Sequence, residues 1–121
     1  MAKRSEFVEW LLEQLSPLGT VRARAMFGAY GLYLDDLFFG LVDEDILYLK
    51  VDDDNLQRFL SAGSQPFRYM AKDGKQMSMS YFSPPDSVLD VPADLIDWAR
   101  EGIHAALRAK SAGGKRKSKK R

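Results

Sequence analysis

Few residues of this chain have the type and spacing that catalysis requires. Histidine occurs once, at His104 on the expected polar face of a C-terminal helix, and no Ser, Cys or Asp stands at a recognisable relay spacing from it. A general base needs its partner within hydrogen-bond reach, so we interpret His104 as a solvated helix residue. The sequence contains no cysteine, which excludes a thiol nucleophile, a disulfide and a Cys-ligated metal. We therefore expect a protein that is not an enzyme and holds no cofactor.

Carboxylates gather in two runs, Asp43–Asp45 and Asp52–Asp54, which raise the question of a metal ion. The runs lack the alternating ligands, central glycine and distal glutamate of an EF-hand loop. Tight turns between strands and the capping of a helix N-terminus account for both runs. The sequence therefore predicts no metal site.

A cluster of arginine, glycine and aromatic residues is the best candidate for a partner or ligand surface. Arg22 and Arg24 are two residues apart, so in an extended segment both side chains point to the same side. They would bind an anion or an acidic partner, or else pair with carboxylates of this chain, and both interpretations stay open. Gly28 or Gly31 is expected at positive φ, where the chain turns into a strand. The candidate surface comprises Arg22, Arg24, Phe27, Gly28, Tyr30 and Gly31.

The charge of the chain is unevenly distributed. Eleven basic and 17 acidic residues precede Lys110, a formal charge of −6, whereas seven basic residues and no acidic one occupy residues 110–121. We therefore divide the chain into a domain, residues 1–110, and a disordered basic tail, residues 111–121. A dense run of cations binds polyanions without reading their sequence, so the tail predicts weak, non-specific contact with DNA or RNA; the alternative is a solubilising terminus. The tail cations are Lys115, Arg116, Lys117, Lys119, Lys120 and Arg121.

Three apolar, aromatic-rich segments predict the framework that positions these residues. They are Tyr30–Leu34, Leu37–Val42 and Ile46–Val51, and the short acidic turns between them are typical of an antiparallel meander. Their aromatic residues raise the possibility of a base-stacking platform like that of RNA-recognition sheets. The sequence motif of such sheets is missing, so packing in a core is the better explanation.

Helices and a hairpin complete the expected fold. An amphipathic helix follows Ser5, a short helix follows the second acidic run, and a long helix begins near Pro92. The Asp73-Gly74 pair predicts a hairpin turn. The result is an α+β fold of two layers: an antiparallel sheet of about five to six strands, with a central meander, and N- and C-terminal helices packed on it. Trp98 is expected at the seam between the last helix and the sheet.

The sequence gives no sign of a membrane protein. No apolar run reaches the roughly 20 residues that a membrane-spanning helix needs. Glu6, Glu9 and Glu13 interrupt the apolar residues near the N-terminus, so a signal peptide is not predicted. We expect a cytoplasmic protein.

Two strings of the sequence resemble the N-terminal domain of the TfoX/Sxy family. The first has the pattern R-x-R-x-M-F-G-x-Y-G-L-Y from Arg22, and the second, L-Y-L-K-V, begins at Leu47. Phe67 and Tyr69 agree further, and the likeness covers roughly residues 5–110. The family consists of bacterial regulators of natural competence. The resemblance implies a two-layer α+β domain and co-regulation of transcription with the cyclic-AMP receptor protein. Full-length members carry a second, helical domain, and here a basic tail follows instead.

We therefore expect a regulatory or interaction module that binds a protein partner, either part of the transcription machinery or a regulator of it. The tail would add non-specific contact with nucleic acid. The alternative is a small-molecule sensor with a pocket between sheet and helices near Phe27–Tyr30.

Overall fold

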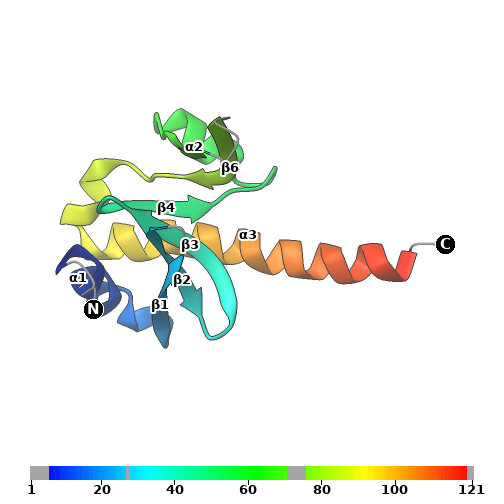
Figure 1. Ribbon diagram of the computed structural model, residues 1–121, viewed down its shortest axis with the longest axis horizontal. Coiled ribbons are helices and arrows are strands. Elements are labelled where there is room, and N and C mark those ends of the chain that lie inside the picture. Colours follow the sequence, from blue (N-terminus) through cyan, green and yellow to red (C-terminus); the bar gives the residue numbers. More distant parts are fainter. Residues whose placement is uncertain (1–5, 27, 71–75, 120–121) are drawn as a thin grey trace.

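The computed structural model describes residues 6–26, 28–70 and 76–119, and its elements follow one another as the sequence predicts (Figure 1). The helices are α1 (Glu6–Gln14), α2 (Leu56–Ser61) and α3 (Pro92–Lys119), with short 3₁₀ helices η1 (Ser16–Leu18) and η2 (Asp86–Asp90). The strands are β1 (Val21–Met26), β2 (Ala29–Leu34), β3 (Leu37–Asp43), β4 (Ile46–Lys50), β5 (Pro66–Met70) and β6 (Gln76–Phe82).

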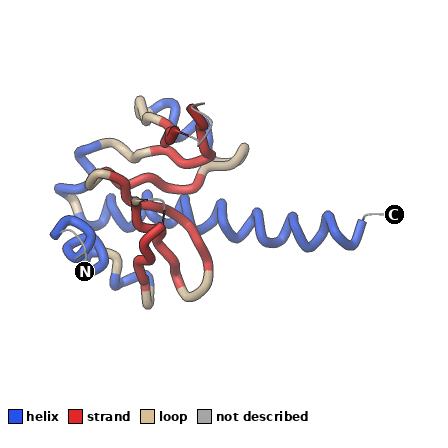
Figure 2. The backbone as a smooth tube through the Cα atoms, in the orientation of Figure 1, coloured by secondary structure: helices blue, strands red, loops and turns tan. Residues whose placement is uncertain are grey.

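The strands form one antiparallel sheet in the order β1-β2-β3-β4-β6-β5, which confirms the predicted α+β class (Figure 2). Strands β1 to β4 make the meander. Asp35, Glu44 and Asp45 adopt positive φ angles of 56°, 52° and 62° in its acidic turns, as tight hairpin turns require. Gly28 has φ 80° between β1 and β2, which confirms that one of the two conspicuous glycines has positive φ. The predicted turn at 73–74 lies outside the described residues.

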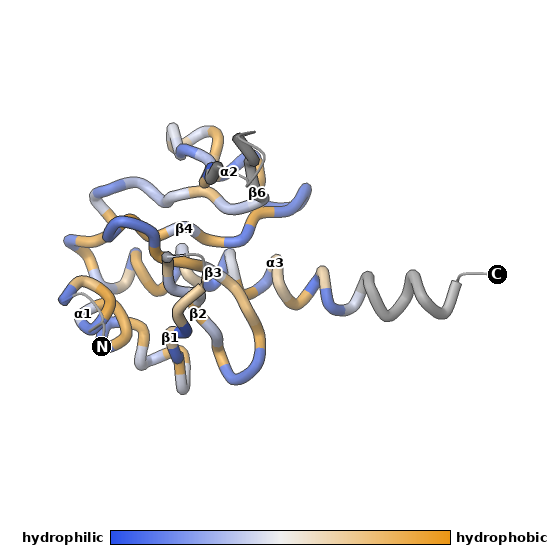
Figure 3. The backbone as a smooth tube through the Cα atoms, viewed as in Figure 1, coloured by the Kyte–Doolittle hydropathy of each residue, from blue (hydrophilic) through white to orange (hydrophobic). Residues whose placement is uncertain are grey.

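Helices α1 and α3 pack on the same face of the sheet and share one core with it. Leu11 of α1, Leu32 of β2 and Ala99 of α3 are fully enclosed there. Helix α3 crosses β3 so closely that a Cβ on Gly102 would lie 2.7 Å from the carbonyl oxygen of Phe39. A glycine is therefore required at this crossing. Figure 3 shows hydrophobic residues along the strands and along the part of α3 that crosses the sheet.

The opposite face of the sheet carries a second, aromatic cluster. Leu41 and Val42 are neighbours in β3 and so point to opposite faces. Val42 packs in the helix-covered core, whereas Leu41 belongs to the second cluster. We call this surface the aromatic face. It consists of Tyr33, Phe38, Leu41, Tyr48, Phe67 and Tyr81.

Helix α3 is longer than the sequence predicts. Its helical backbone continues past Lys110 to Lys119, whereas we expected disorder from residue 111. Alanine, lysine and arginine all favour a helix, and they outnumber the glycines at 113 and 114 in this segment. The end of α3 projects away from the sheet (Figure 1). Neither α3 nor any other helix in the described part of the chain is apolar enough to cross a membrane.

Candidate functional site

The β1–β2 hairpin positions most of the residues that the sequence singles out. Arg22 and Arg24 lie on β1, an edge strand, and both are exposed. Tyr30 turns to the helix-covered face, where it is half-buried against the core. Gly28 lies at the turn, and Phe27 lies outside the described residues. The predicted surface is therefore split between the two faces of the hairpin.

Tyr33, rather than Tyr30, is the aromatic neighbour of the arginines. The guanidinium carbon of Arg24 lies 5.6 Å from the ring centroid of Tyr33. Such a contact contributes about 0.5–1 kcal/mol at an exposed site, which favours the Arg24 side chain lying along the sheet. Among the described residues, no carboxylate lies within ion-pair distance of Arg24. Its charge is therefore available to a partner.

Arg22 has partners within the chain, but they hold it weakly. Its Nη2 atom donates to the carbonyl oxygen of Asp35 at 3.2 Å and lies 3.4 Å from Oδ1 of Asp36. The side chains of Arg22 and Asp36 are 59% and 101% exposed. Exposed pairs of this kind contribute about 0–1 kcal/mol. Internal pairing is thus confirmed for Arg22, whereas binding of an anion or an acidic partner stays a prediction.

Gly31 lies beneath the aromatic face and has ordinary strand geometry. A Cβ at this position would lie 2.8 Å from Sδ of Met26 and 3.0 Å from the ring of Phe38. Close packing, and not positive φ, therefore explains this glycine.

The rings of the aromatic face form a row across the sheet. Tyr33 stacks on Phe38 with ring centroids 5.1 Å apart, and Phe38 lies 5.5 Å from Tyr81. Arg24 contacts one end of this row, and Lys50 lies 5.3 Å from the Tyr81 ring at the other. The sequence did not reveal the row, because Tyr81 comes beside Phe38 only through the pairing of β4 with β6, which no local turn determines. In β4 the less buried Tyr48 and Lys50 alternate with the buried Leu47 and Leu49, and this alternation in the sequence indicates a second face of the sheet.

Two phenols of the aromatic face, those of Tyr48 and Tyr81, have a raised pKa. Burial raises the pKa of Tyr81 to about 12, and the neighbouring Tyr33 adds to the rise. Burial, followed by the charges of Asp43 and Glu44, also raises the pKa of Tyr48. Both hydroxyls stay protonated at neutral pH. The face therefore offers planar rings and flanking cations, which suit binding rather than proton transfer.

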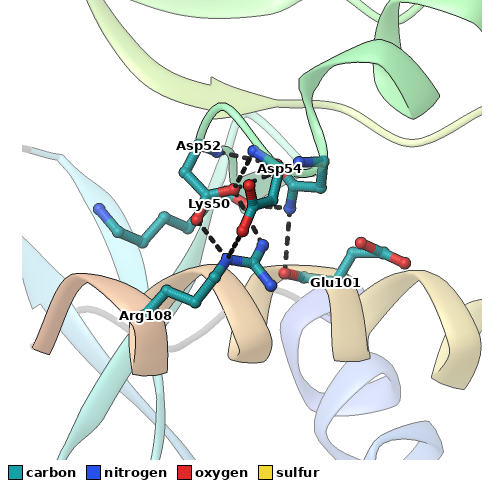
Figure 4. A network of polar contacts seen from close by, with 6 residues as sticks. Lys50, Asp52, Asp54, Glu101 and Arg108 are labelled. Atoms are coloured by element: carbon teal, nitrogen blue, oxygen red, sulfur yellow. Dashed lines mark hydrogen bonds and ion pairs between the residues drawn. The ribbon is translucent and has the colours of Figure 1, made fainter. Parts of the chain in front are cut away.

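The second acidic run is used to hold α3 (Figure 4). Arg108 binds both carboxylate oxygens of Asp52, at 2.7 and 2.9 Å, and lies 3.1 Å from Asp54. Hydrogen bonding to Arg108 is the main reason that the pKa of Asp52 is lowered. Asp52 also accepts a hydrogen bond from the backbone of Asp54 at 3.0 Å, the turn chemistry expected from the sequence. In the described part of the chain, no group of three side chains could hold a metal ion.

Asn55 is the buried centre of the same network. It is 3% exposed, and its side chain accepts from the backbone N–H of Asp52 at 2.8 Å. It donates to the carbonyl oxygens of Lys50 and Glu101, at 3.3 and 3.1 Å. One amide thus joins β4, the turn before α2, and α3. The sequence did not distinguish it from an ordinary turn residue.

Trp98 packs against the core that α3 shares with the sheet, and it also contacts α2. Phe59 of α2 meets it edge to face at 4.9 Å, and the guanidinium of Arg58 lies 4.3 Å over its ring. Asp97 and Glu101 each bind Arg58 at 2.6 Å. Asp97 and Glu101 therefore face α2.

The tail and the predicted pocket are only partly placed. Residues 115–119 belong to the helical backbone of α3, and Lys120 and Arg121 lie outside the described residues. A hollow of about 60 Å³ lies elsewhere, between Ile46 at the start of β4 and Pro84 after β6. The pocket near Phe27–Tyr30 stays a prediction, because Phe27 is not described.

Known proteins resemble this chain over most of its length. A family model described as the TfoX N-terminal domain matches residues 13–106. The chain belongs to the TfoX N-terminal domain family. Protein Sxy of Escherichia coli (strain K12) is 29% identical to it over 99 residues. DNA transformation protein TfoX1 of Aliivibrio fischeri (strain ATCC 700601 / ES114) is 27% identical over 99 residues. Each alignment covers 82% of this chain and 47% of the relative, so the chain spans about half the length of these curated relatives.

The region matched to the TfoX N-terminal domain contains both arginines of β1 and the whole aromatic face. It ends at residue 106, before Arg108 and before the basic tail. The candidate surface therefore lies in the part of the chain that the family model describes.

Proposed function

We propose that this TfoX N-terminal domain is a cytoplasmic regulatory module without enzymatic activity, which binds a protein partner that acts in transcription. Arg22 and Arg24 carry this proposal, because both are exposed on an edge strand and Arg24 lies beside the Tyr33 ring. Arginine beside aromatic residues is enriched at protein interfaces. By contrast, Arg58 and Arg108 are engaged within the chain. The relative named DNA transformation protein supports a role in the regulation of DNA uptake.

The chemistry of the described residues supports recognition rather than catalysis. His104 is exposed on α3, and among the described residues it makes no hydrogen bond with a hydroxyl or a carboxylate. Nucleophilic catalysis and general base catalysis both need such a pair.

A genetic experiment tests the regulatory role. In the host, deletion of the gene should change transformation by added DNA and the transcripts of DNA-uptake genes. The wild-type chain should restore both, whereas the Arg22→Glu/Arg24→Glu variant should not. Arg68→Glu/Arg100→Glu is the matched control, because it makes the same charge change at two other exposed arginines. Full restoration by the first variant would contradict the assignment of the surface.

The basic tail supplies the second part of the proposed function. The tail, residues 111–121, carries six basic residues and no acidic one, and residues 1–110 have a formal charge of −5, so the tail attracts a nucleic-acid backbone that the domain repels. We expect a Kd on the order of 10⁻⁴ to 10⁻⁵ M for duplex DNA at physiological salt. Titration of the full chain and of residues 1–110 at two salt concentrations tests this. Equal affinity of the two chains would leave the tail as a solubilising terminus.

A further inference from the structure

The two edges of the sheet differ in how open they are. Strand β5 begins with Pro66, and its register with β6 shifts between Pro66 and Arg68. Proline and bulges are the usual protection of an edge against added strands. Strand β1 contains no proline and pairs with β2 at all six positions without a shift. Among the described strands β1 pairs with β2 alone, so it presents a regular outer edge.

The side chains from Val21 to Arg24 alternate between the two faces of β1. Val21 and Ala23 pack against the core, which holds the strand firmly on the domain. Arg22 and Arg24 point to the other face and are exposed. The edge therefore combines fixed backbone groups with two positive charges at alternate positions.

These charges select the occupant of the edge. A second copy of this chain, added antiparallel through its own β1, would place arginine opposite arginine on the same face. Like charges directly opposite one another are destabilising. Carboxylates at alternate positions of an added strand would instead face both Arg22 and Arg24. Arg24 has no carboxylate partner among the described residues. Arg22 can exchange its weak contact with the exposed Asp36 for a carboxylate of the added strand.

We propose that an extended, acidic segment of a protein partner adds to β1 as a seventh strand of the sheet. Backbone hydrogen bonds along the outer edge of β1 would hold the segment, and its alternate acidic side chains would pair with the two arginines. Its remaining side chains would be apolar, because they lie beside Val21 and Ala23. The inference rests on the proposed function that this domain binds a protein partner, and it names the mode and the chemistry of that contact.

A short labelled peptide of alternating glutamate and valine tests the inference with the full chain. We expect the fluorescence anisotropy of the peptide to rise as it binds. Amide hydrogen exchange should slow at residues 21–26 and their neighbours and nowhere else. Arg22→Glu/Arg24→Glu should weaken binding about tenfold or more and should instead bind the matching lysine–valine peptide. Replacement of the central valine of the peptide by proline should also abolish binding, because proline removes a backbone donor.

Other outcomes overturn the inference. Equal binding of the proline peptide, or protection on the aromatic face instead of β1, would show a contact that is not strand addition. Protection of β1 without peptide would show self-association. If the peptide protects the aromatic face and a single-stranded oligonucleotide displaces it, the aromatic face is a surface on which nucleic-acid bases stack. A peptide that fails to bind, in a chain whose regulatory activity still needs both arginines, would overturn strand addition and leave the proposed function standing.

Discussion

Replacement of Asn55 by alanine should destabilise the domain strongly, because the side chain holds three elements together. The side chain is 3% exposed and bridges three elements. Alanine would remove the acceptor for the N–H of Asp52 and the donor for the carbonyl oxygens of Lys50 and Glu101. With a net contribution of about 1 kcal/mol for each hydrogen bond, the free energy of unfolding should fall by about 3 kcal/mol. The melting temperature should fall by about 10 °C.

Urea unfolding at neutral pH, followed by far-UV circular dichroism, measures this loss. The midpoint should fall while the slope stays constant, because the extent of the fold is unchanged. Gln57→Ala is the matched control, since Gln57 is exposed on α2 and, among the described residues, its side chain bonds Ser61 alone. It should change the stability by less than about 0.5 kcal/mol.

A second variant separates the two roles of the Asn55 amide. Asn55→Asp keeps an acceptor for the Asp52 N–H but cannot donate to the two carbonyl oxygens, and it buries a charge near Asp52. We expect it to cost at least as much as alanine. If Asn55→Ala and Gln57→Ala unfold at the same urea concentration, the view that this amide holds α3 to the sheet is refuted.

Three further predictions concern α3. The pKa of Asp52 is lowered in the folded state, so its contribution to stability is present above its ordinary value of 3.8 and is lost as the pH falls through the folded pKa. Arg108→Gln should therefore flatten the acid side of a plot of urea midpoint against pH; an unchanged slope would contradict the pairing. Gly102→Ala should destabilise by about 2 kcal/mol in urea, although helix propensity alone predicts a gain of about 1 kcal/mol, because the new Cβ meets the carbonyl oxygen of Phe39. Trp98→Ala should lower the free energy of unfolding by about 2–3 kcal/mol, measured by thermal unfolding. This is less than the loss of a fully enclosed ring would cost, because Trp98 is half-buried; a variant that melts like the parent would exclude the packing on α2.

Local patterns were sufficient to predict the meander and not the whole sheet. Strands β2, β3 and β4 are joined by tight acidic turns, so each turn determines its own pairing. The pairing of Leu49 with Phe82 joins residues far apart in the sequence, and no turn determines it. The contact between Phe38 and Tyr81 depends on that pairing. The aromatic face therefore could not be predicted, although the individual strands could.

Polar residues on α3 show a second limit of sequence periodicity. A helical pattern separates polar from apolar positions, but it does not tell a solvated side chain from one that bonds a neighbouring element. Glu101 and Arg108 belong to the polar face by pattern, yet they bind Arg58 and Asp52. Arg24 is the opposite case. Its exposure follows from the edge position of β1, which is a property of the whole sheet.

The two basic regions of this chain are physically distinct and should bind differently. The tail offers a dense run of cations, so its contact with a polyanion depends on counterion release and weakens steeply with salt. Among its described residues the β1 edge offers the two arginines Arg22 and Arg24, and in the proposed strand addition backbone hydrogen bonds would supply the rest of the affinity. Salt screens exposed charges, whereas backbone hydrogen bonds are far less sensitive to it. Salt should therefore weaken binding at the β1 edge less than binding by the tail. In the proposed function, sequence-independent attraction to nucleic acid would concentrate the domain where its partner acts, while the choice of partner would depend on the edge.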